Sequence, residues 1–242
     1  MSPLGDDLSA HEQDVVQAYM RLVHQRFIDG RRSLHCDWLG RTAIKYPTDL
    51  WIYQEIIVRR RPDLIVECGT HKGGSALFLA SVCDLVGHGR VVSIDLRNGP
   101  GADLPAHPRL EFLAGSTTSP EILDAVRARA AASRNDAGPD AAAPEVLVIL
   151  DSDHRLLHVL DELEAYAPLV RPGGYLIAED THVNGRPNQP EHGPGPAEAA
   201  AFFLARHPEF EVDRSCERFL LSLNAGGYLR RRETAADGGT AL

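Results

Sequence analysis

Short apolar runs alternate with amphipathic segments along most of this chain of 242 residues. The apolar runs have the length of strands, and those in the middle of the chain contain almost no polar residue, as expected for strands covered on both faces. This alternation predicts an α/β domain with a mostly parallel sheet and helices on both of its faces. The expected strands are 64–67, 90–95, 110–115, 145–151, 175–180, 210–213 and 218–223, and helical spacing continues at 76–80, 121–132, 156–169 and 197–205.

The segment before the first expected strand has a different pattern. Residues 10–30 carry apolar side chains at helical spacing up to a glycine, which predicts an amphipathic helix. Residues 39–49 lack periodicity and are interpreted as a loop, and a short helix is expected at 51–60 with Trp51 on its inward face. The chain is therefore expected to consist of an N-terminal cap at 1–60, a ligand-binding domain at 61–230 and a tail at 231–242.

A glycine-rich turn follows the first expected strand. Glu67 ends the strand, and Gly69 and the pair Gly73-Gly74 lead into the next helix. Glycine lets the backbone turn sharply and lets a ligand lie against it, and the free N–H groups of a helix start can meet a polar ligand. His71 replaces the second glycine of the dinucleotide fingerprint, and no Gly-Lys-Ser/Thr closes the turn as in a P-loop. The alternative is a tight turn that binds no ligand.

The form Glu67-Cys68-Gly69-Thr70…Gly73-Gly74-Ser75 resembles motif I of class I S-adenosylmethionine (SAM) methyltransferases. The resemblance implies a Rossmann-like sheet of seven strands that ends in an antiparallel hairpin, here 210–213 with 218–223. It also implies that the turn holds the methionine end of SAM and that an acid after the next strand takes the ribose hydroxyls. The residues expected to contact SAM are Glu67, Gly69, Thr70, Gly73, Gly74, Ser75, Asp95, Gly115, Ser116 and Asp151.

Acids follow two further expected strands. Asp151 ends 145–151, and Glu179 and Asp180 end 175–180. The carboxyl ends of neighbouring parallel strands share one sheet edge, so the three carboxylates should converge beside the glycine turn, where they would repel one another without a cation. Oxygen ligands favour Mg2+, so these three acids are predicted to hold it. Alternatively, they cap helices or pair with Arg155 and Arg186.

His154 lies three residues after Asp151 and can reach the same place. An imidazole suits proton abstraction near neutral pH, so His154 is the predicted general base, with Asp151 as its catalytic neighbour. A histidine at a helix start can also be merely exposed or capping. Asp153 could replace Asp151 as a metal ligand, orient His154 or cap the following helix.

The chain resembles the family of cephalosporin hydroxylase and rhamnosyl O-methyltransferases from about residue 40 to 230. The matching elements are Lys45-Tyr46-Pro47-x-Asp49-x-Trp51, the glycine turn, Leu150-Asp151-Ser152-Asp153-His154, Glu179-Asp180-Thr181 and Gly226-Gly227-Tyr228-Leu229. The acids and the histidine are also similar to those of macrocin-type sugar O-methyltransferases, a resemblance that implies Asp151, Glu179 and Asp180 as Mg2+ ligands and His154 as the base.

The family resemblance implies SAM as methyl donor, a deoxysugar hydroxyl of a natural product as acceptor, and homo-oligomers. The loops at 40–49 and 183–196 are expected to close over the acceptor. The residues assigned to acceptor contact are Tyr46, Asp49, Trp51, His182 and Asn184.

Composition narrows the range of partners. A formal net charge of -9 argues against nucleic acid as the main partner, because phosphate binding needs a basic face. No run is long enough to span a bilayer, and four scattered cysteines without C-x-x-C spacing favour reduced thiols in the cytoplasm. Only 6% of residues are aromatic, which mildly favours a sugar over a flat phenol as acceptor.

Three other functions fit parts of the pattern. A catechol or caffeoyl-CoA type O-methyltransferase uses a similar acidic edge, but commonly has Asp-Asn where this chain has Glu179-Asp180. A SAM-binding partner protein that no longer methylates would keep the glycine turn. A nicotinamide dehydrogenase is disfavoured by the missing second glycine and by the expected terminal hairpin.

Overall fold

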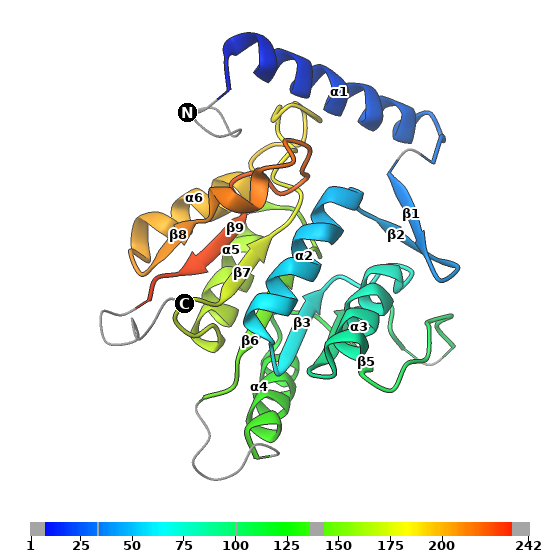
Figure 1. The fold of residues 1–242 in the computed structure, drawn as a ribbon, viewed down its shortest axis with the longest axis vertical. Helices are drawn as coiled ribbons and strands as arrows, with labels where there is room; N and C mark the ends of the chain where they lie inside the picture. The colour runs from blue at the N-terminus through cyan, green and yellow to red at the C-terminus, as the bar shows by residue number, and fades with distance from the viewer. Residues whose placement is uncertain (1–7, 33, 100, 136–142, 234–242) are drawn as a thin grey trace.

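The computed structural model describes residues 8–32, 34–99, 101–135 and 143–233. Seven strands form one sheet in the order β5-β4-β3-β6-β7-β9-β8 (Figure 1). The strands from β5 to β7 are parallel, whereas β9 runs antiparallel to both β7 and β8. The predicted seven-stranded, mostly parallel sheet with a terminal antiparallel pair is confirmed. The strands are β3 (Leu64–Cys68), β4 (Arg90–Asp95), β5 (Leu110–Ala114), β6 (Val146–Leu150), β7 (Tyr175–Ala178), β8 (Phe210–Val212) and β9 (Tyr228–Arg231).

The register of the sheet aligns the carboxyl ends of its central strands. Cys68 of β3 pairs with Leu150 of β6, and Leu150 pairs with Ala178 of β7. The residues that follow these strands therefore emerge next to one another at a single edge. Binding sites in open parallel sheets form at this edge.

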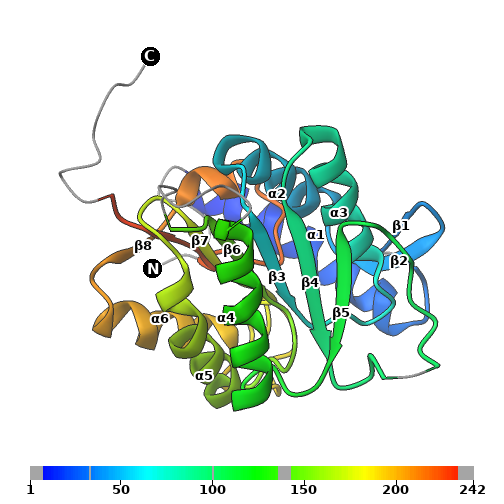
Figure 2. The ribbon, with the colours of Figure 1, turned by 90° about the horizontal axis from the view of Figure 1, so that it is seen from below.

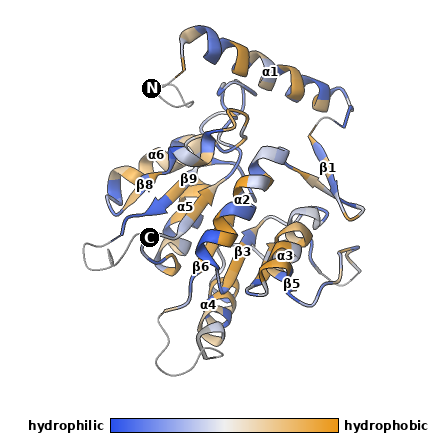
Figure 3. Ribbon diagram, viewed as in Figure 1, coloured by the Kyte–Doolittle hydropathy of each residue, from blue (hydrophilic) through white to orange (hydrophobic). Residues whose placement is uncertain are grey.

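Helices cover both faces of the sheet (Figure 2). Helices α2 (Pro47–Arg60) and α3 (Gly74–Val86) pack on one face. On the other face lie α4 (Pro120–Asn135), α5 (Leu156–Tyr166), which continues into the 3-10 turn Ala167–Leu169, and α6 (Pro196–Arg206). Because both faces are covered, the central strands are mostly hydrophobic: β6 is wholly apolar, and Glu67 is the one charged residue of β3 (Figure 3).

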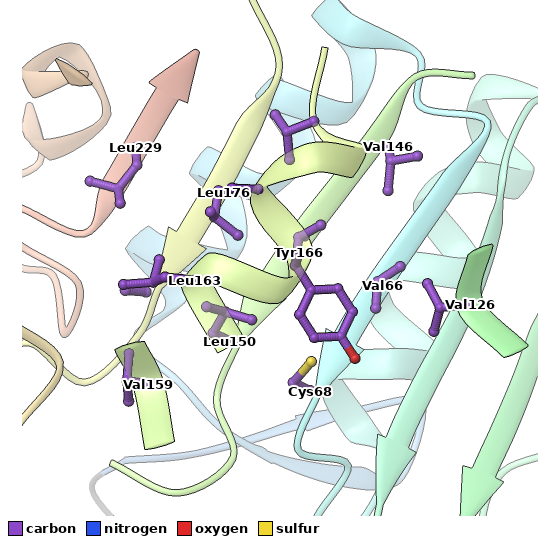
Figure 4. Close-up of a cluster of buried hydrophobic side chains, with 14 of the residues drawn as sticks. Val66, Cys68, Val126, Val146, Leu150, Val159, Leu163, Tyr166, Leu176 and Leu229 are labelled. Atoms are coloured by element: carbon purple, nitrogen blue, oxygen red, sulfur yellow. The ribbon is translucent and has the colours of Figure 1, made fainter. Parts of the chain in front are cut away.

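The hydrophobic core between the sheet and helices α4, α5 and α6 includes a tyrosine that hydrogen-bonds to the segment after β5. Val66 and Leu176 of the sheet pack there with Leu163 and Tyr166 of α5 (Figure 4). Burying a valine or leucine side chain fully contributes about 1.5–3 kcal/mol each. The Tyr166 hydroxyl donates to the carbonyl oxygen of Thr117 at 2.8 Å. Packing and hydrogen bonding thus fix the segment after β5.

Helix α1 (Ala10–Ile28) confirms the predicted N-terminal helix. Its start is a capping box, in which Glu12 N donates to Ser9 Oγ at 3.3 Å and Ser9 N donates to Glu12 Oε2 at 2.8 Å. The helix lies apart from the sheet helices in Figure 1 and packs on a separate small core that includes Met20, Tyr46 and Leu223. Tyr46 immediately precedes α2, so this core joins α1 to the body of the domain.

The region expected to be a loop at 39–49 contains regular structure, so that prediction was wrong. Strands β1 (His35–Trp38) and β2 (Arg41–Ile44) pair as a hairpin, and α2 already begins at Pro47. Both turn residues, Leu39 and Gly40, have positive φ (48° and 78°), as in the tight turns that match the twist of a hairpin. Strands this short carry too little alternation to be recognised.

Two other expectations about this chain also need correction. Trp51 is 59% exposed and its Nε1 donates to Glu55, so it does not face inward. The strand that pairs with β8 is β9, at 228–231, instead of 218–223. Ser222 Oγ and Leu223 N both donate to the buried carboxylate of Asp49, which holds that segment in an irregular conformation.

Three further predictions concern the division of the chain, membrane-spanning helices and the state of the cysteines. The inner face of α2 packs on the sheet although α2 lies within the expected cap at 1–60, and residues 234–242 of the expected tail lie outside the described residues. The division into 1–60, 61–230 and 231–242 therefore stays a prediction. Across the described part of the chain, no helix is long and apolar enough to cross a membrane. The four cysteines are free thiols.

Candidate active site

The turn after β3 needs glycine because other backbone segments approach it closely. Gly69 has φ +99°, and a Cβ atom there would lie 1.9 Å from the carbonyl oxygen of Asp151. A Cβ atom on Gly74 would lie 2.4 Å from the backbone of Thr42 in β2. Any side chain at these two positions would push the end of β6 or the β1–β2 hairpin away from the turn. The two glycines therefore allow the end of β6 and the β1–β2 hairpin to pack closely against the turn.

Each of the neighbouring strands β3 and β4 carries an acid at or next to its carboxyl end. Glu67 is buried, its Oε2 accepts from Ser93 Oγ at 2.5 Å, and burial raises the pKa of its carboxyl group to about 7. Asp95 is half-buried and accepts from the backbone N–H groups of Thr70 at 3.1 Å and Arg97 at 2.9 Å. Asp95 thus braces the glycine turn from the position expected for a ribose-binding acid.

Asp151 and Glu179 follow β6 and β7 and share one buried cation. The ammonium group of Lys45, which directly follows β2, donates to Asp151 Oδ2 and to Glu179 Oε2. Lys45 and Glu179 are 3% and 1% exposed. Tyr53 of α2 also donates to Glu179, at 2.5 Å. Glu179 is therefore fully engaged within the protein.

The ammonium group supplies the charge that these carboxylates require. Burial raises the pKa of Glu179 well above its usual value, the charge of Asp151 adds to this, and Lys45 opposes it. Burial by itself would lower the pKa of Lys45, but the two carboxylates outweigh burial and raise it. Lys45 therefore stays charged. The repulsion that was expected to require a divalent cation is relieved here, for two of the three acids, by a lysine.

Asp180 belongs to a second group. It has a positive φ of 53°, a strained conformation for a residue other than glycine, and such strain clusters at functional sites. Its Oδ2 lies 3.2 Å from His154 Nε2, which in turn lies 4.0 Å from Asp151 Oδ1. Burial raises the pKa of Asp180, but the nearby imidazoles of His154 and His182 and the ammonium group of Lys45 outweigh burial and lower it. Asp180 is therefore ionised beside the predicted base.

This second group has the geometry of a cation site. Among the described residues, Asp151, His154 and Asp180 each offer one ligand atom, and these atoms lie within 4.8 Å of one another. Glu179 is not in the group, because its carboxylate is bound by Lys45 and Tyr53. Of the three predicted ligands, two share a common point, and Glu179 as a ligand stays a prediction.

Two of the alternatives considered for these acids involve Arg186, as an ion-pair partner, and Asp153, as a substitute metal ligand. Arg186 pairs with Glu198, with Nη2 3.1 Å from Oε1. Asp153 is exposed, and its Oδ1 accepts from Arg155 N at 3.1 Å, so it caps the turn that leads into α5. Its cap bond makes Asp153 a weaker substitute for Asp151 as a metal ligand.

One cavity of about 730 Å3 connects these groups. Strand order places the residues after β4 and β5 on one side of the glycine turn and the residues after β6 and β7 on the other. The first side of the cavity is lined by Gly69, Thr70, Ser75, Asp95, Gly115 and Ser116, and the second by Asp151, Asp153, His154, Asp180 and Gln189. Phe27 of α1 also lines the cavity. The cavity is large enough for a nucleoside-containing cofactor together with part of a second small molecule.

None of the five residues assigned to acceptor contact lines this cavity. Tyr46 and Asp49 are buried in the junction between α2 and the 222–228 region, where Asp49 Oδ1 accepts from the Tyr228 hydroxyl at 2.8 Å. Trp51 is exposed on α2. His182 packs against the ring of His24, and Asn184 donates to Glu198 at 3.2 Å. Neighbours in the chain line the cavity instead, among them Lys45 before Tyr46 and Asp180 before His182.

Sequence reasoning missed the functional position of Lys45. The residue was noted only as part of the matching motif Lys45-Tyr46-Pro47. His158 was also missed; its Nε2 lies 3.0 Å from Ser152 Oγ and 3.2 Å from Thr117 Oγ1. His158 thereby ties the end of β6 to the segment after β5.

Comparison with known proteins supports the sequence resemblance. The family model for Rhamnosyl O-methyltransferase/CmcI matches residues 31–232. A rhamnosyl O-methyltransferase of Mycobacterium leprae is 33% identical over 198 residues, which are 81% of this chain and 82% of the relative. One of Mycobacterium tuberculosis (strain ATCC 25618 / H37Rv) is 34% identical over 199 residues, 80% and 77% of the two chains.

Solved structures show the same fold at lower identity. The apo structure of CmcI-N160 is 20% identical and covers 87% of this chain and 84% of its own, with a TM-score of 0.61. The structure described as cmcI-D160 Mg-SAM is 18% identical and covers 81% and 76%, with a TM-score of 0.56.

Proposed function

Because the chain belongs to the Rhamnosyl O-methyltransferase/CmcI family, we propose that it transfers the methyl group of SAM to a hydroxyl of a deoxysugar. Family membership defines the reaction class, so the chain is a SAM-dependent O-methyltransferase. We propose three further details of the reaction: the acceptor is a rhamnosyl-type sugar, a natural product carries this sugar, and Mg2+ assists the transfer. The observation that supports them best is the single cavity that joins the glycine turn to Asp151, His154 and Asp180.

The first side of the cavity fits SAM. Asp95 lies at the end of β4 and lines the cavity, as an acid that accepts from ribose hydroxyls would. Ser75 lies in the first turn of α3, where backbone N–H groups and a hydroxyl can meet the methionine end. When bound there, SAM supplies a methyl group on a positively charged sulfur. The proposed contacts are Glu67, Gly69, Thr70, Gly73, Gly74, Ser75, Asp95, Gly115, Ser116 and Asp151.

The group formed by Asp151 and Asp180 fits a divalent cation, since carboxylate oxygens suit Mg2+. We keep Glu179 as the third proposed ligand, with the condition that it exchange a bond to Lys45 for one to the metal. When bound, Mg2+ would lower the pKa of the acceptor hydroxyl and orient it.

His154 is the proposed base. Its Nε2 lines the cavity and can take the proton of the acceptor hydroxyl. The imidazolium that forms is stabilised by the carboxylate of Asp180, 3.2 Å away. Asp151, whose Oδ1 lies 4.0 Å from the same nitrogen, adds a second negative charge. Positioning and deprotonation are the tasks of the protein, because transfer from a sulfonium is already favourable.

The reaction is tested by incubating the purified protein with SAM, Mg2+ and p-nitrophenyl α-L-rhamnopyranoside. We expect S-adenosylhomocysteine and a mono-methylated rhamnoside by mass spectrometry. Binding of S-adenosylhomocysteine without product from rhamnosides, but with product from catechols, would replace the sugar by a phenol as acceptor. Binding without methylation of either class would support a partner protein that only binds SAM.

We also propose that the protein is a homo-oligomer with α1 in the interface. Val15, Tyr19 and Leu22 form an exposed apolar stripe on α1, on the side away from its buried residues. Acids are concentrated at the start of the helix and arginines near its end, so an antiparallel pair of α1 helices would place opposite charges together. Light scattering of the wild type and of Tyr19→Glu tests this, and a monomeric wild type would contradict it.

A further inference from the structure

We propose that Gln189 and Phe27 form the acceptor subsite of the cavity. In this proposal, Gln189 binds a ring hydroxyl next to the one that is methylated, and Phe27 covers the apolar side of the sugar. The inference rests on the proposed function, because it assigns this end of the cavity to the acceptor of methyl transfer.

Helix α1 and the loop after β7 meet over the second side of the cavity. In Figure 1 the loop lies directly below α1. The rings of His24 in α1 and His182 in the loop pack edge to face, with centroids 5.8 Å apart. Gln189 Nε2 lies 3.4 Å from His24 Nε2, and Phe27, almost one helical turn further along α1, lines the same cavity as Gln189. Two segments that are distant in sequence therefore build one wall.

The backbone holds Gln189 in an unusual conformation. Its φ is +47°, a value that residues other than glycine rarely adopt. The turn is pinned on both sides, because Asn188 N donates to the His182 carbonyl at 3.1 Å and His192 N donates to the Gln189 carbonyl at 3.0 Å. Backbone strain of this kind persists where the surroundings fix it, and it often serves a binding site. The direction of the Gln189 side chain is therefore set before a ligand binds.

The carboxamide of Gln189 has capacity left for a ligand. It offers two N–H donors and an oxygen with two lone pairs, and the contact with His24 uses only one of these. His24 Nδ1 is buried and has no hydrogen-bond partner among the described residues. A sugar hydroxyl both donates and accepts hydrogen bonds. It can therefore bond directly to the carboxamide of Gln189 and, through a water molecule, to His24 Nδ1. Asp180 and His154 line the same cavity, so such a hydroxyl would adjoin the reacting one.

Phe27 gives this end of the cavity an apolar wall. Its half-buried ring packs edge to face on the ring of His35, with centroids 5.5 Å apart, and Ile44 lines the cavity with it. A 6-deoxysugar carries a methyl group where a hexose carries a hydroxymethyl group. An apolar wall without a partner for that extra hydroxyl favours the deoxysugar, because a buried polar group left unpaired is costly. The wall thus selects the substrate class.

The experiment compares Gln189→Leu with the matched control Gln25→Leu, an exposed glutamine of α1. With p-nitrophenyl α-L-rhamnopyranoside as the probe, loss of one hydrogen bond to the acceptor should raise KM about tenfold. We expect kcat to change little and the affinity for S-adenosylhomocysteine, measured by calorimetry, to stay at the wild-type value. The penalty should disappear with the rhamnoside analogue that lacks the bonded hydroxyl. The control should match the wild type in all three measurements.

His24 and Phe27 are tested by readouts of their own. His24→Phe removes the contact that positions Gln189 and should raise KM for the rhamnoside while the affinity for S-adenosylhomocysteine is kept. Phe27→Ser should reduce the ratio of kcat/KM for the rhamnoside to that for p-nitrophenyl α-L-mannopyranoside, which differs from the rhamnoside only by its hydroxymethyl group.

These experiments distinguish a failure of the proposed function from a failure of the proposed acceptor subsite. If the wild type methylates no rhamnoside, the proposed function is overturned. If the wild type methylates the rhamnoside and Gln189→Leu keeps its KM, or instead loses affinity for S-adenosylhomocysteine, the acceptor subsite is overturned.

Discussion

The ammonium group of Lys45 lies against the carboxylate of Glu179 in the interior, although 134 positions separate the two residues in the chain. The same ammonium group contacts Asp151, so that one residue after β2 pairs with two acids after β6 and β7. The N-terminal hairpin is thereby joined electrostatically to the carboxyl edge of the sheet. This contact links the stability of the domain to the geometry of its site.

Lys45→Met should lower the free energy of unfolding by about 3–5 kcal/mol, because removing one partner of a buried ion pair leaves uncompensated charge. Urea denaturation at neutral pH measures this. Lys72→Met serves as the control, since Lys72 is exposed and should change little. A loss below 1 kcal/mol would mean that the buried acids take up protons easily or that water reaches them.

His154→Ala should lower kcat by about 10²–10⁴-fold, the usual contribution of a general base. Calorimetry should give an unchanged affinity for S-adenosylhomocysteine, since His154 lies with the acids after β6 and β7, away from Asp95. The control is His11→Ala, at an exposed position of α1. Wild-type turnover in His154→Ala would remove this residue from the role of base.

Removal of the metal should abolish turnover, and Mg2+ should restore it. Asp151→Asn, Glu179→Gln and Asp180→Asn should each weaken Mn2+ binding, measured by electron paramagnetic resonance, by at least about tenfold. Asp153→Asn is the matched control, because Asp153 is exposed and caps a turn. Undiminished binding in Glu179→Gln alone would leave Lys45 as the permanent partner of Glu179 and reduce the proposed ligand set to Asp151 and Asp180.

The sheet and the strand-end acids could be predicted because their signals are local. Val146–Leu150 is wholly apolar, as a strand buried on both faces must be, and the acid that follows it is placed at the sheet edge by topology alone. The same reasoning failed at 218–223, which is more apolar than β9. What separates the two segments is the buried carboxylate of Asp49, which binds Leu223 N from 174 positions away. No local pattern can reveal such a contact.

The lining of the site was harder to predict for a similar reason. Tyr46 and Asp49 belong to a motif that was assigned to the acceptor, yet both are buried, and the adjacent Lys45 reaches the acids instead. Which residue of such a motif faces the cavity depends on the β1–β2 hairpin, whose strands are too short to be recognised. Phe27 and Gln189 line one cavity only because α1 packs on the loop after β7, where His24 contacts Gln189.

The buried carboxyl group of Glu67 should make stability depend on pH in a defined direction. Burial raises its pKa from 4.5 to about 7 in the folded state. Between these values the folded state keeps a proton that the unfolded state has released, so the free energy of unfolding falls as the pH rises. Glu67→Gln cannot ionise and lacks this contribution.

From pH 4 to pH 8, the wild type should therefore lose up to about 3 kcal/mol in its free energy of unfolding relative to Glu67→Gln. Urea denaturation across this range measures the difference, and Glu121→Gln, at an exposed position at the start of α4, is the control. A difference between the wild type and Glu67→Gln that stays constant with pH would show that Lys45 and Ser93 keep Glu67 ionised despite its burial.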